Sequence, residues 1–323
     1  MYSESVFIQK PKFSWGFLAH LGFNLFADPV RDANGVPCMV QDAAQHSAED
    51  HLRFDTDLWH ETTKALADAG CNLVVLDIGE GYCFESHPEI ACRGAWTRDV
   101  LQEEIFNLRM LGIEAIPKLN FSACRDAWMG EYGRMVSTSA YYRFCEDVIG
   151  EICEVFGRPR LFHLGMDEET VESQRLYNTV VIRQGEQWWY DLNFLARTAM
   201  RCGARPWIWA DGVRRREAEL VRRTPRDILL SYRWQTGGEA EEALNCRALA
   251  ALADAGFEQI PAAGAAESYG ALDALCGYAA EHLRGELLCG FLQTVWKPMM
   301  RRYADAQTDA IAALSAARAA WER

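Results

Sequence analysis

The chain has 323 residues, half of them hydrophobic, and a formal net charge of -13 at pH 7. A chain of this length and apolar content can bury a large core. The excess of carboxylates argues against a polyanionic partner, so we expect no binding of nucleic acid. No apolar run approaches the roughly 18 residues that a membrane span needs, so we expect no membrane partner. The basic run Arg214-Arg215-Arg216 is interpreted as a solvated helix face.

The start of the chain and its cysteines both bear on its location. The first residues, MYSESVFIQKPKF, lack the basic end and the apolar core of a secretory signal peptide. The 11 cysteines form no CxxC pair, and several of them, such as Cys71, Cys202 and Cys289, lie in apolar runs. This usage is typical of reduced, packed thiols. We therefore expect a cytoplasmic protein that holds no metal and no cofactor, and a homodimer stays open.

The predicted elements alternate between strands and helices along the chain. The first strand, 13–20, comes before any helix. Six later strands each follow a glycine, because glycine accepts the left-handed conformation that closes a helix. These strands cover 71–77, 113–120, 158–165, 204–211, 257–264 and 286–296, and their glycines are Gly70, Gly112, Gly157, Gly203, Gly256 and Gly285. Another strand is expected at 227–232.

Apolar positions three and four residues apart predict a helix after each strand. The helices cover 57–69, 97–111, 141–156, 187–202, 214–223, 239–255, 268–283 and 299–321. Strict alternation predicts a parallel sheet, and eight units favour closure into a (β/α)8 TIM barrel. We expect a single domain over 1–323, with the barrel core at about 13–321. An open doubly wound sheet is the alternative, but no glycine-rich phosphate loop marks its first turn.

The predicted loops are unequal in length. Four loops from strand to helix are long, namely 21–56, 78–96, 121–140 and 169–186, whereas the loops from helix to strand are short. All four long loops fall at the C-terminal mouth of the predicted barrel, where barrel enzymes keep their chemistry. Long irregular loops in a compact domain are usually functional. The sequence thus predicts a site at this mouth.

The stretch 161–169, LFHLGMDEE, is the strongest single signal in the chain. It opens as a buried strand and ends in three consecutive carboxylates, Asp167, Glu168 and Glu169. Adjacent carboxylates raise each other's pKa, and a glycosidase needs an acid with a raised pKa beside a group that stabilises positive charge. The alternative is an acidic first turn of the following helix, which the helix dipole favours. His163 is interpreted as a hydrogen-bonded core residue.

Other predicted strand ends carry polar and aromatic residues that suit a carbohydrate. Indole and phenol rings stack on the apolar faces of sugar rings, while carboxylates and amides bind hydroxyls. Tryptophan is also a normal core residue, so each assignment has a structural alternative. The candidate substrate-binding residues are His20, Asp77, Asn120, Trp209, Asp211, Tyr232, Trp234, Glu267 and Trp296. We therefore expect a small carbohydrate or a glycoconjugate as the substrate.

The segment His163-Leu164-Gly165-Met166-Asp167-Glu168 resembles the H-x-G-G-D-E motif on strand 4 of family 20 glycoside hydrolases, the β-N-acetylhexosaminidases. The resemblance implies that Glu168 is the general acid/base. It also implies that Asp167 holds the 2-acetamido group of the substrate, whose carbonyl oxygen acts as the nucleophile. The expected activity is removal of a β-linked N-acetylhexosamine by substrate-assisted retaining catalysis, with no metal or cofactor.

The resemblance extends to later strand ends. Trp209-Ala210-Asp211 is similar to the next strand-end segment of the family, which carries a tryptophan and an acid. Trp234 and Trp296 stand where family tryptophans wall the acetamide pocket. Tyr232 is implied as the hydroxyl that binds the acetamide oxygen.

The chain departs from the family's pattern at three places. His20 stands where the family has an arginine, the run 117–120 replaces an acid and a histidine, and Lys297 follows the last-strand tryptophan where the family has a glutamate. Two alternatives therefore stay open. One is a retaining glycosidase in which Glu168 works with Glu267 as a covalent nucleophile. The other is a sugar-binding barrel without catalytic activity.

Overall fold

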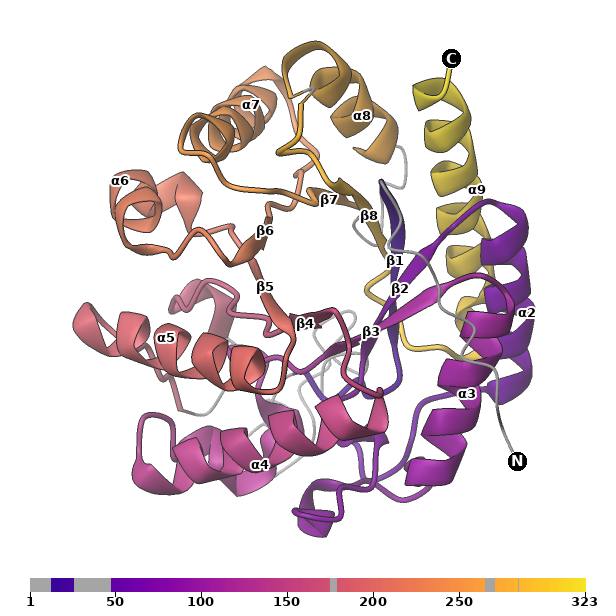
Figure 1. The fold of residues 1–323 in the computed structure, drawn as a ribbon, viewed down its shortest axis with the longest axis vertical. Coiled ribbons are helices and arrows are strands. Elements are labelled where there is room, and N and C mark those ends of the chain that lie inside the picture. Colours follow the sequence, from indigo (N-terminus) through magenta and orange to yellow (C-terminus); the bar gives the residue numbers. More distant parts are fainter. Residues whose placement is uncertain (1–12, 26–47, 175–178, 265–270, 284) are drawn as a thin grey trace, which may run out of the picture.

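The computed structural model describes residues 13–25, 48–174, 179–264, 271–283 and 285–323. Eight parallel strands stand in a ring, and helices surround them (Figure 1). Neighbouring strands follow the order β6-β5-β4-β3-β2-β1-β8-β7. The strands are β1 Ser14–His20, β2 Leu73–Asp77, β3 Glu114–Lys118, β4 Leu161–His163, β5 Arg205–Trp209, β6 Leu229–Ser231, β7 Ala262–Ala263 and β8 Gly290–Thr294.

The ring closes between β6 and β7 through backbone hydrogen bonds that extend past the ends of both strands. Ile260 and Ala262 donate to the carbonyls of Leu230 and Tyr232, at 2.9 Å each. Trp234 donates in turn to the carbonyl of Ala262 at 2.7 Å. The predicted (β/α)8 barrel is therefore confirmed, and the open doubly wound sheet is wrong. Closure leaves no free sheet edge and gives the strands a common mouth.

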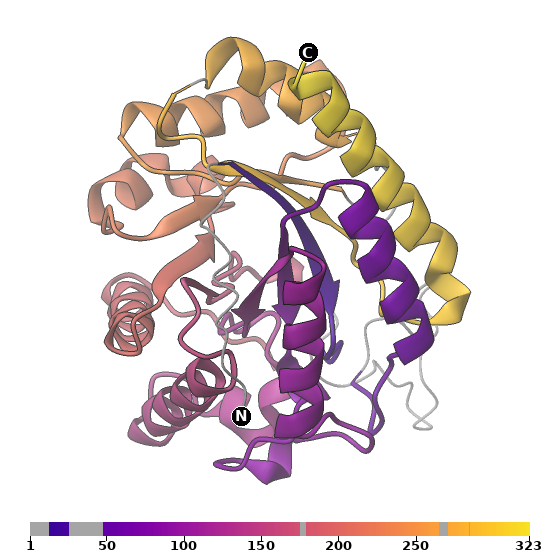
Figure 2. The same cartoon turned by 45° about the vertical axis from the view of Figure 1, so that its right-hand side comes forward.

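The described residues form eight α-helices around the ring. They are α2 Thr56–Asp68, α3 Arg98–Met110, α4 Ser139–Val155, α5 Glu186–Arg201, α6 Val213–Arg223, α7 Glu239–Asp254, α8 Ala271–His282 and α9 Ala304–Trp321. Side chains of Asp55, Thr97 and Thr138 accept backbone N–H groups and so cap the starts of α2, α3 and α4. Figure 2 shows α2 and α9, the first and last of the described helices, side by side on the outside of the barrel.

The last helix begins later than the sequence predicts. The prediction starts it at residue 299, whereas α9 starts at Ala304 after a short 3-10 helix, Arg301–Tyr303. The carbonyl of Met299 instead accepts a hydrogen bond from the backbone N–H of Asp55 at 2.6 Å. A tertiary contact therefore holds this segment out of the helix.

Five of the six predicted glycine joints have the expected conformation. Gly70, Gly112, Gly157, Gly203 and Gly256 have φ between 69° and 86°, which closes the preceding helix. Gly285 is not among the glycines with positive φ. It lies three residues beyond His282, the last residue of α8, so it does not occupy the closing position. The prediction of a left-handed glycine there is wrong.

The barrel has two layers of apolar packing. Side chains that point into the ring, such as Leu18, Val75, Ile116 and Leu292, form one buried cluster. Side chains on the opposite face of the strands pack against the helices in a second, larger cluster. Strands buried on both faces explain the continuous apolar runs in the sequence. Among the described helices, none combines the length and the apolar character that crossing a bilayer requires.

Candidate active site

The turn after β4 places the predicted carboxylates. Gly165 and Met166 both have positive φ, at 72° and 63°, and the second value is uncommon for a residue with a side chain. A Cβ atom on Gly165 would fall 2.0 Å from Oδ1 of Asn120, so the backbone approaches the end of β3 closely. The left-handed pair turns the chain at the strand end and leads directly into Asp167. The family motif has glycine at both positions, which agrees with this backbone.

The turn yields a stability prediction. Replacing Gly165 by alanine should destabilise the fold by about 2–5 kcal/mol, since the added methyl group collides with Asn120 and the left-handed backbone adds its own cost. Urea unfolding measures the change. Gly150→Ala, in the middle of α4 with no atom within 4 Å of the new Cβ, should instead stabilise by about 0.5–1 kcal/mol. Equal stability of the two variants would contradict this account of the turn.

Asp167 is buried and held from two sides. Its Oδ2 accepts a hydrogen bond from Nδ2 of Asn120 at 2.7 Å, and its Oδ1 lies 3.2 Å from Nη2 of Arg233. Burial by itself raises the pKa of Asp167, but the charges of Arg233 and Arg125 and the bond from Asn120 outweigh it and hold the pKa below its ordinary value. Asp167 is therefore a carboxylate at neutral pH.

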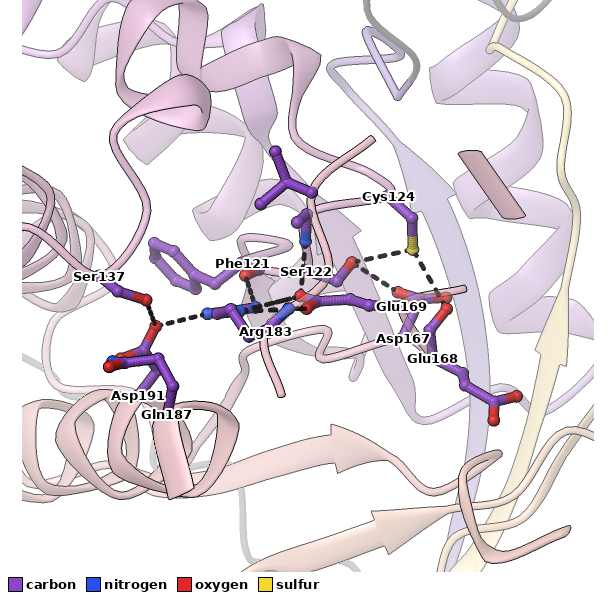
Figure 3. Close-up of polar contacts among 12 residues, drawn as sticks. Phe121, Ser122, Cys124, Ser137, Asp167, Glu168, Glu169, Arg183, Gln187 and Asp191 are labelled. Carbon is purple, nitrogen blue, oxygen red and sulfur yellow. Dashed lines mark hydrogen bonds and ion pairs between the residues drawn. The ribbon is translucent and has the colours of Figure 1, made fainter. Parts of the chain in front are cut away.

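Glu168 lies in a different environment. Its side chain extends away from Glu169 and from Asp167 (Figure 3), keeps 23% of its surface exposed, and lies 3.5 Å from Nε of Arg215. Burial raises the pKa of Glu168, Arg215 partly offsets this, and Asp211 adds to it. The expectation that Asp167 and Glu169 raise this pKa is wrong, because the three carboxylates point to different partners.

Glu169 belongs to a buried ion-pair network rather than to the mouth (Figure 3). It pairs with Arg183 and accepts a hydrogen bond from the backbone N–H of Ala123 at 2.8 Å. Arg183 also binds Asp191 of α5 at 3.0 Å and the carbonyl of Phe121 at 2.8 Å. The network ties the loop after β4 to the loop after β3 and to α5. The third carboxylate of the motif thus has a structural task.

Arg233, which follows β6, contacts residues at the ends of β5 and β8 as well as Asp167. The sequence analysis did not select it. Its backbone N–H and its Nε both donate to Asp211, at 3.1 and 2.5 Å. Its guanidinium lies 5.3 Å from the ring centroid of Trp209 and 5.5 Å from that of Trp296. Three predicted site residues, Trp209, Asp211 and Trp296, therefore meet around one cation beside Asp167.

Tyr232 and Trp234 do not face this group. The hydroxyl of Tyr232 donates to Oδ1 of Asn245 in α7 at 2.8 Å. The ring of Trp234 packs 5.7 Å from that of Tyr278 in α8. Successive residues of an extended segment point to opposite faces, so an inward Arg233 requires outward neighbours. The acetamide-binding roles expected for Tyr232 and Trp234 stay predictions, although both side chains contact α7 and α8 rather than Asp167. No short-range signal in the sequence marks Arg233, because the few strand residues before it do not define the phase of the segment. Glu267 lies outside the described residues.

His20 and Asp77 lie together at the ends of β1 and β2. Nδ1 of His20 is 3.2 Å from Oδ2 of Asp77, and the buried ammonium of Lys118 donates to the same oxygen. Burial raises the pKa of Asp77, but Lys118 and His20 outweigh it and hold the pKa below its ordinary value. The ring of His20 is 5.4 Å from that of Trp296, which connects this cluster to Arg233. Lys118 is a second member that the sequence analysis did not select.

Several buried polar atoms without a hydrogen-bond partner lie at this mouth. Among the described residues they include Nε2 of His20, Nε2 of His163 and Nε1 of Trp209. The rings of His163, Trp209 and Trp296 lie next to one another, with centroids 4.5 Å apart for His163 and Trp209 and 6.1 Å apart for Trp209 and Trp296. Unsatisfied buried polar groups are rare in folded proteins and mark functional or hydrated sites. The mouth therefore suits a polar ligand.

His163 itself behaves as a core residue. Its Nδ1 accepts a hydrogen bond from the backbone N–H of Gly165 at 3.0 Å. Burial and the charge of Lys118 hold its pKa well below the ordinary value, so the ring is neutral. The prediction of a hydrogen-bonded core histidine is confirmed.

The arginine run at the start of α6 is not a solvated face, which corrects the sequence-based interpretation. Arg214 pairs with Glu241 of α7 at 2.5 Å, and Arg216 lies 4.2 Å over the ring of Trp188 in α5. Arg215 reaches Glu168. Two of the three arginines thus join neighbouring helices, and the third lies at the mouth.

One group of three candidate metal ligands occurs among the described residues, formed by Glu49, Asp50 and His51. Two of its members are exposed and the third is half-buried, and none belongs to the mouth described above. Exposed acidic groups of this kind are common without an ion. We assign no metal to them.

The fold is shared with several solved structures, although no protein-family model and no curated protein matches the sequence. The β-N-acetylhexosaminidase from Bacteroides fragilis aligns with a TM-score of 0.65 and 12% identity, over 95% of this chain and 66% of that one. The GH20 exo-β-N-acetylglucosaminidase from Vibrio harveyi aligns at 0.61 and 13%, over 96% and 57%. Dispersin B aligns at 0.56 and 15%, over 82% and 94%.

Identities this low show a common fold. The chain spans less than two thirds of the length of the Bacteroides and Vibrio proteins, at 66% and 57%. The expected likeness to the barrel of family 20 glycoside hydrolases is confirmed at the level of the fold.

Proposed function

We propose that this chain is a glycoside hydrolase that removes a β-linked N-acetylhexosamine from a small carbohydrate or a glycoconjugate. The observation that carries the proposal is the contrast between two successive carboxylates at the barrel mouth. Asp167 is buried among cations that keep it ionised, whereas Glu168 is partly exposed and its pKa is raised by burial. Pairs of titratable groups whose surroundings separate their pKa values mark acid and base assignments.

The proposed first step uses both carboxylates. Glu168 donates its proton to the glycosidic oxygen, the acetamide carbonyl oxygen of the substrate attacks the sugar carbon, and the bond to the leaving group breaks. Asp167 accepts the acetamide N–H and faces the positive charge that develops on the acetamide group. In the second step Glu168 takes a proton from water, the water oxygen bonds to the sugar carbon, and the acetamide oxygen is released. The configuration at that carbon is retained.

Neighbours in the fold support the substrate class. The Vibrio harveyi exo-β-N-acetylglucosaminidase and the Streptomyces plicatus β-hexosaminidase, with TM-scores of 0.61 each, have been determined in complex with N-acetylglucosamine. We propose that residues around Asp167 contact the sugar, directly or through that carboxylate. They are His20, Asp77, Asn120, Trp209, Asp211 and Trp296.

A panel of aryl β-glycosides that differ only at C2 tests the proposal. We expect turnover of the 2-acetamido sugars and little turnover of their 2-hydroxy counterparts, because the acetamide supplies the nucleophile. A preference for a 2-hydroxyl would favour the alternative with Glu168 and Glu267. Binding of these sugars without hydrolysis of any of them would favour the barrel without catalytic activity.

We further propose a cytoplasmic location and a single catalytic domain over 1–323. The cysteines support the location, since all ten within the described residues are free thiols. One barrel that runs from β1 to α9 supports the single domain. A homodimer stays a prediction.

A further inference from the structure

We infer that Arg215 makes this site selective for substrates whose leaving group carries an oxyanion, such as a carboxylate, a sulfate or a phosphate. The inference rests on the proposed function, because it requires Glu168 to protonate the leaving oxygen. It is carried by the position of Arg215 beside Glu168, by the exposure of its side chain and by the charges around it.

Arg215 lies on the side of the mouth where the leaving group must enter. Its Nε is 3.5 Å from Oε1 of Glu168, and 63% of its side chain is exposed. An oxygen that receives a proton from Glu168 lies at about 3 Å from that carboxyl. The first atoms of the leaving group therefore come close to the guanidinium, which has open solvent on its other side.

When Glu168 is protonated, the guanidinium of Arg215 can bind another anion. Within the described parts of the chain, Glu168 is the one carboxylate at ion-pair distance from Arg215. Glu168 is neutral when it acts as the acid, so Arg215 then has no charged partner there. A guanidinium binds carboxylate, sulfate and phosphate groups through paired hydrogen bonds. Once the proton has moved, Glu168 is charged again and competes for Arg215, which favours departure of the anionic leaving group.

Three consecutive arginines lie at this part of the mouth, although the whole chain carries -13. Arg214 and Arg216 flank Arg215 and are held by an ion pair to α7 and by the ring of Trp188. The first turn of α6, which precedes a kink at Arg216, contains no acidic residue. Asp211 is the nearby opposing charge, but Arg233 pairs with it.

The test uses two aryl N-acetyl-β-hexosaminides that carry either a carboxylate or its uncharged carboxamide at the same ring position. The quantity measured is the kcat/KM of the carboxylate compound divided by the kcat/KM of the carboxamide compound. We expect the wild-type ratio to exceed that of Arg215→Gln by about two- to fivefold, the range for a partly exposed ion pair, and to fall with added salt. Arg215→Lys, which keeps the charge, should retain part of the selectivity.

Arg247→Gln is the matched control, because Arg247 is an exposed arginine of α7 that pairs with Glu217. It should leave the ratio at the wild-type value. Equal ratios in the wild type and in Arg215→Gln would overturn the inference. Should neither compound be hydrolysed, the proposed function fails, and the two compounds serve as stable ligands for calorimetry. Tighter binding of the carboxylate compound that Arg215→Gln abolishes would then show only that Arg215 binds the anion, and equal affinities would overturn the inference.

Discussion

Replacing Glu168 by glutamine is expected to lower turnover of an aryl N-acetyl-β-hexosaminide by about 10²–10⁴-fold, the usual contribution of a general acid. Glutamine keeps the size and one carbonyl oxygen of the side chain but has no acidic proton to transfer. The Glu168 side chain is partly exposed and its partner Arg215 is largely exposed, so the fold should tolerate the change. Sugar affinity, measured by calorimetry with N-acetylglucosamine, should stay near the wild-type value.

Glu154→Gln provides the matched control for Glu168→Gln. Glu154 is an exposed glutamate of α4, the helix that precedes β4, so the variant removes the same charge at a distance from the mouth. Its turnover should equal that of the wild type. Unchanged turnover in Glu168→Gln would exclude Glu168 as the acid. The loss of turnover in Glu168→Gln should also be smaller for aryl groups that leave without help from a proton.

The same assignment gives the sign of the pH dependence. Glu168 has to be protonated to act as the acid, and burial raises its pKa, so activity should persist to higher pH than an ordinary glutamate allows and be lost above it. Asp167 has to be ionised, and Arg233 and its neighbours lower its pKa, so activity should persist to lower pH than an ordinary aspartate allows. The expected profile of kcat/KM is a bell, and its alkaline limb should be absent from the residual activity of Glu168→Gln.

Replacing Arg183 by methionine is expected to destabilise the fold by about 3–5 kcal/mol, the cost of breaking a buried ion pair from one side. The side chain of Arg183 is 2% exposed, and its removal leaves Glu169 and Asp191 buried without their cation. The loop after β4 then loses its connection to α5. Urea unfolding monitored by tryptophan fluorescence measures the effect.

Arg201→Met is the control for Arg183→Met, because it also removes an ion pair that involves α5, but one that is exposed. Arg201 of α5 pairs with Glu146 at 2.5 Å, but the two side chains are 57% and 44% exposed. Exposed pairs contribute about 0–1 kcal/mol, so this variant should lose little stability. Similar losses in both variants would mean that burial does not set the strength of the network around Arg183.

Part of the site was visible in the sequence because it sits at a strand end. A run of apolar residues that stops abruptly at Asp167 and Glu168 predicts a buried strand that delivers charge to a barrel mouth, and β4 has this form. Asn120 and Asp211 follow β3 and β5 in the same way, and the structure brings both toward Asp167, through a hydrogen bond and through Arg233. Whether a residue follows a strand end depends only on its neighbours in the chain, so the sequence is enough to predict it.

The remaining part depended on which side chains meet across the barrel. Nothing near Glu169 in the sequence marks it as the partner of Arg183, since the pairing depends on how the loop after β4 folds back. Arg233 was overlooked between two aromatic residues that seemed better suited to a sugar. Its inward direction follows from the phase of the segment after β6, which an unaligned sequence of three or four strand residues does not define.

By itself, the sequence determined the alternating order of strands and helices, the barrel that this order implies, and the pair of carboxylates at the end of the fourth strand. These rest on short-range signals, namely apolar runs, helix caps and closing glycines, whose physics involves residues close together in the chain. Only the tertiary structure decided that Arg233 holds Asp167, that Arg215 faces Glu168 and that Glu169 is buried with Arg183. Each of these pairs joins separate segments of the chain, and whether the two residues meet depends on strand phase and on the path of the loops. Burial and these partners then give the adjacent acids Asp167 and Glu168 different pKa values.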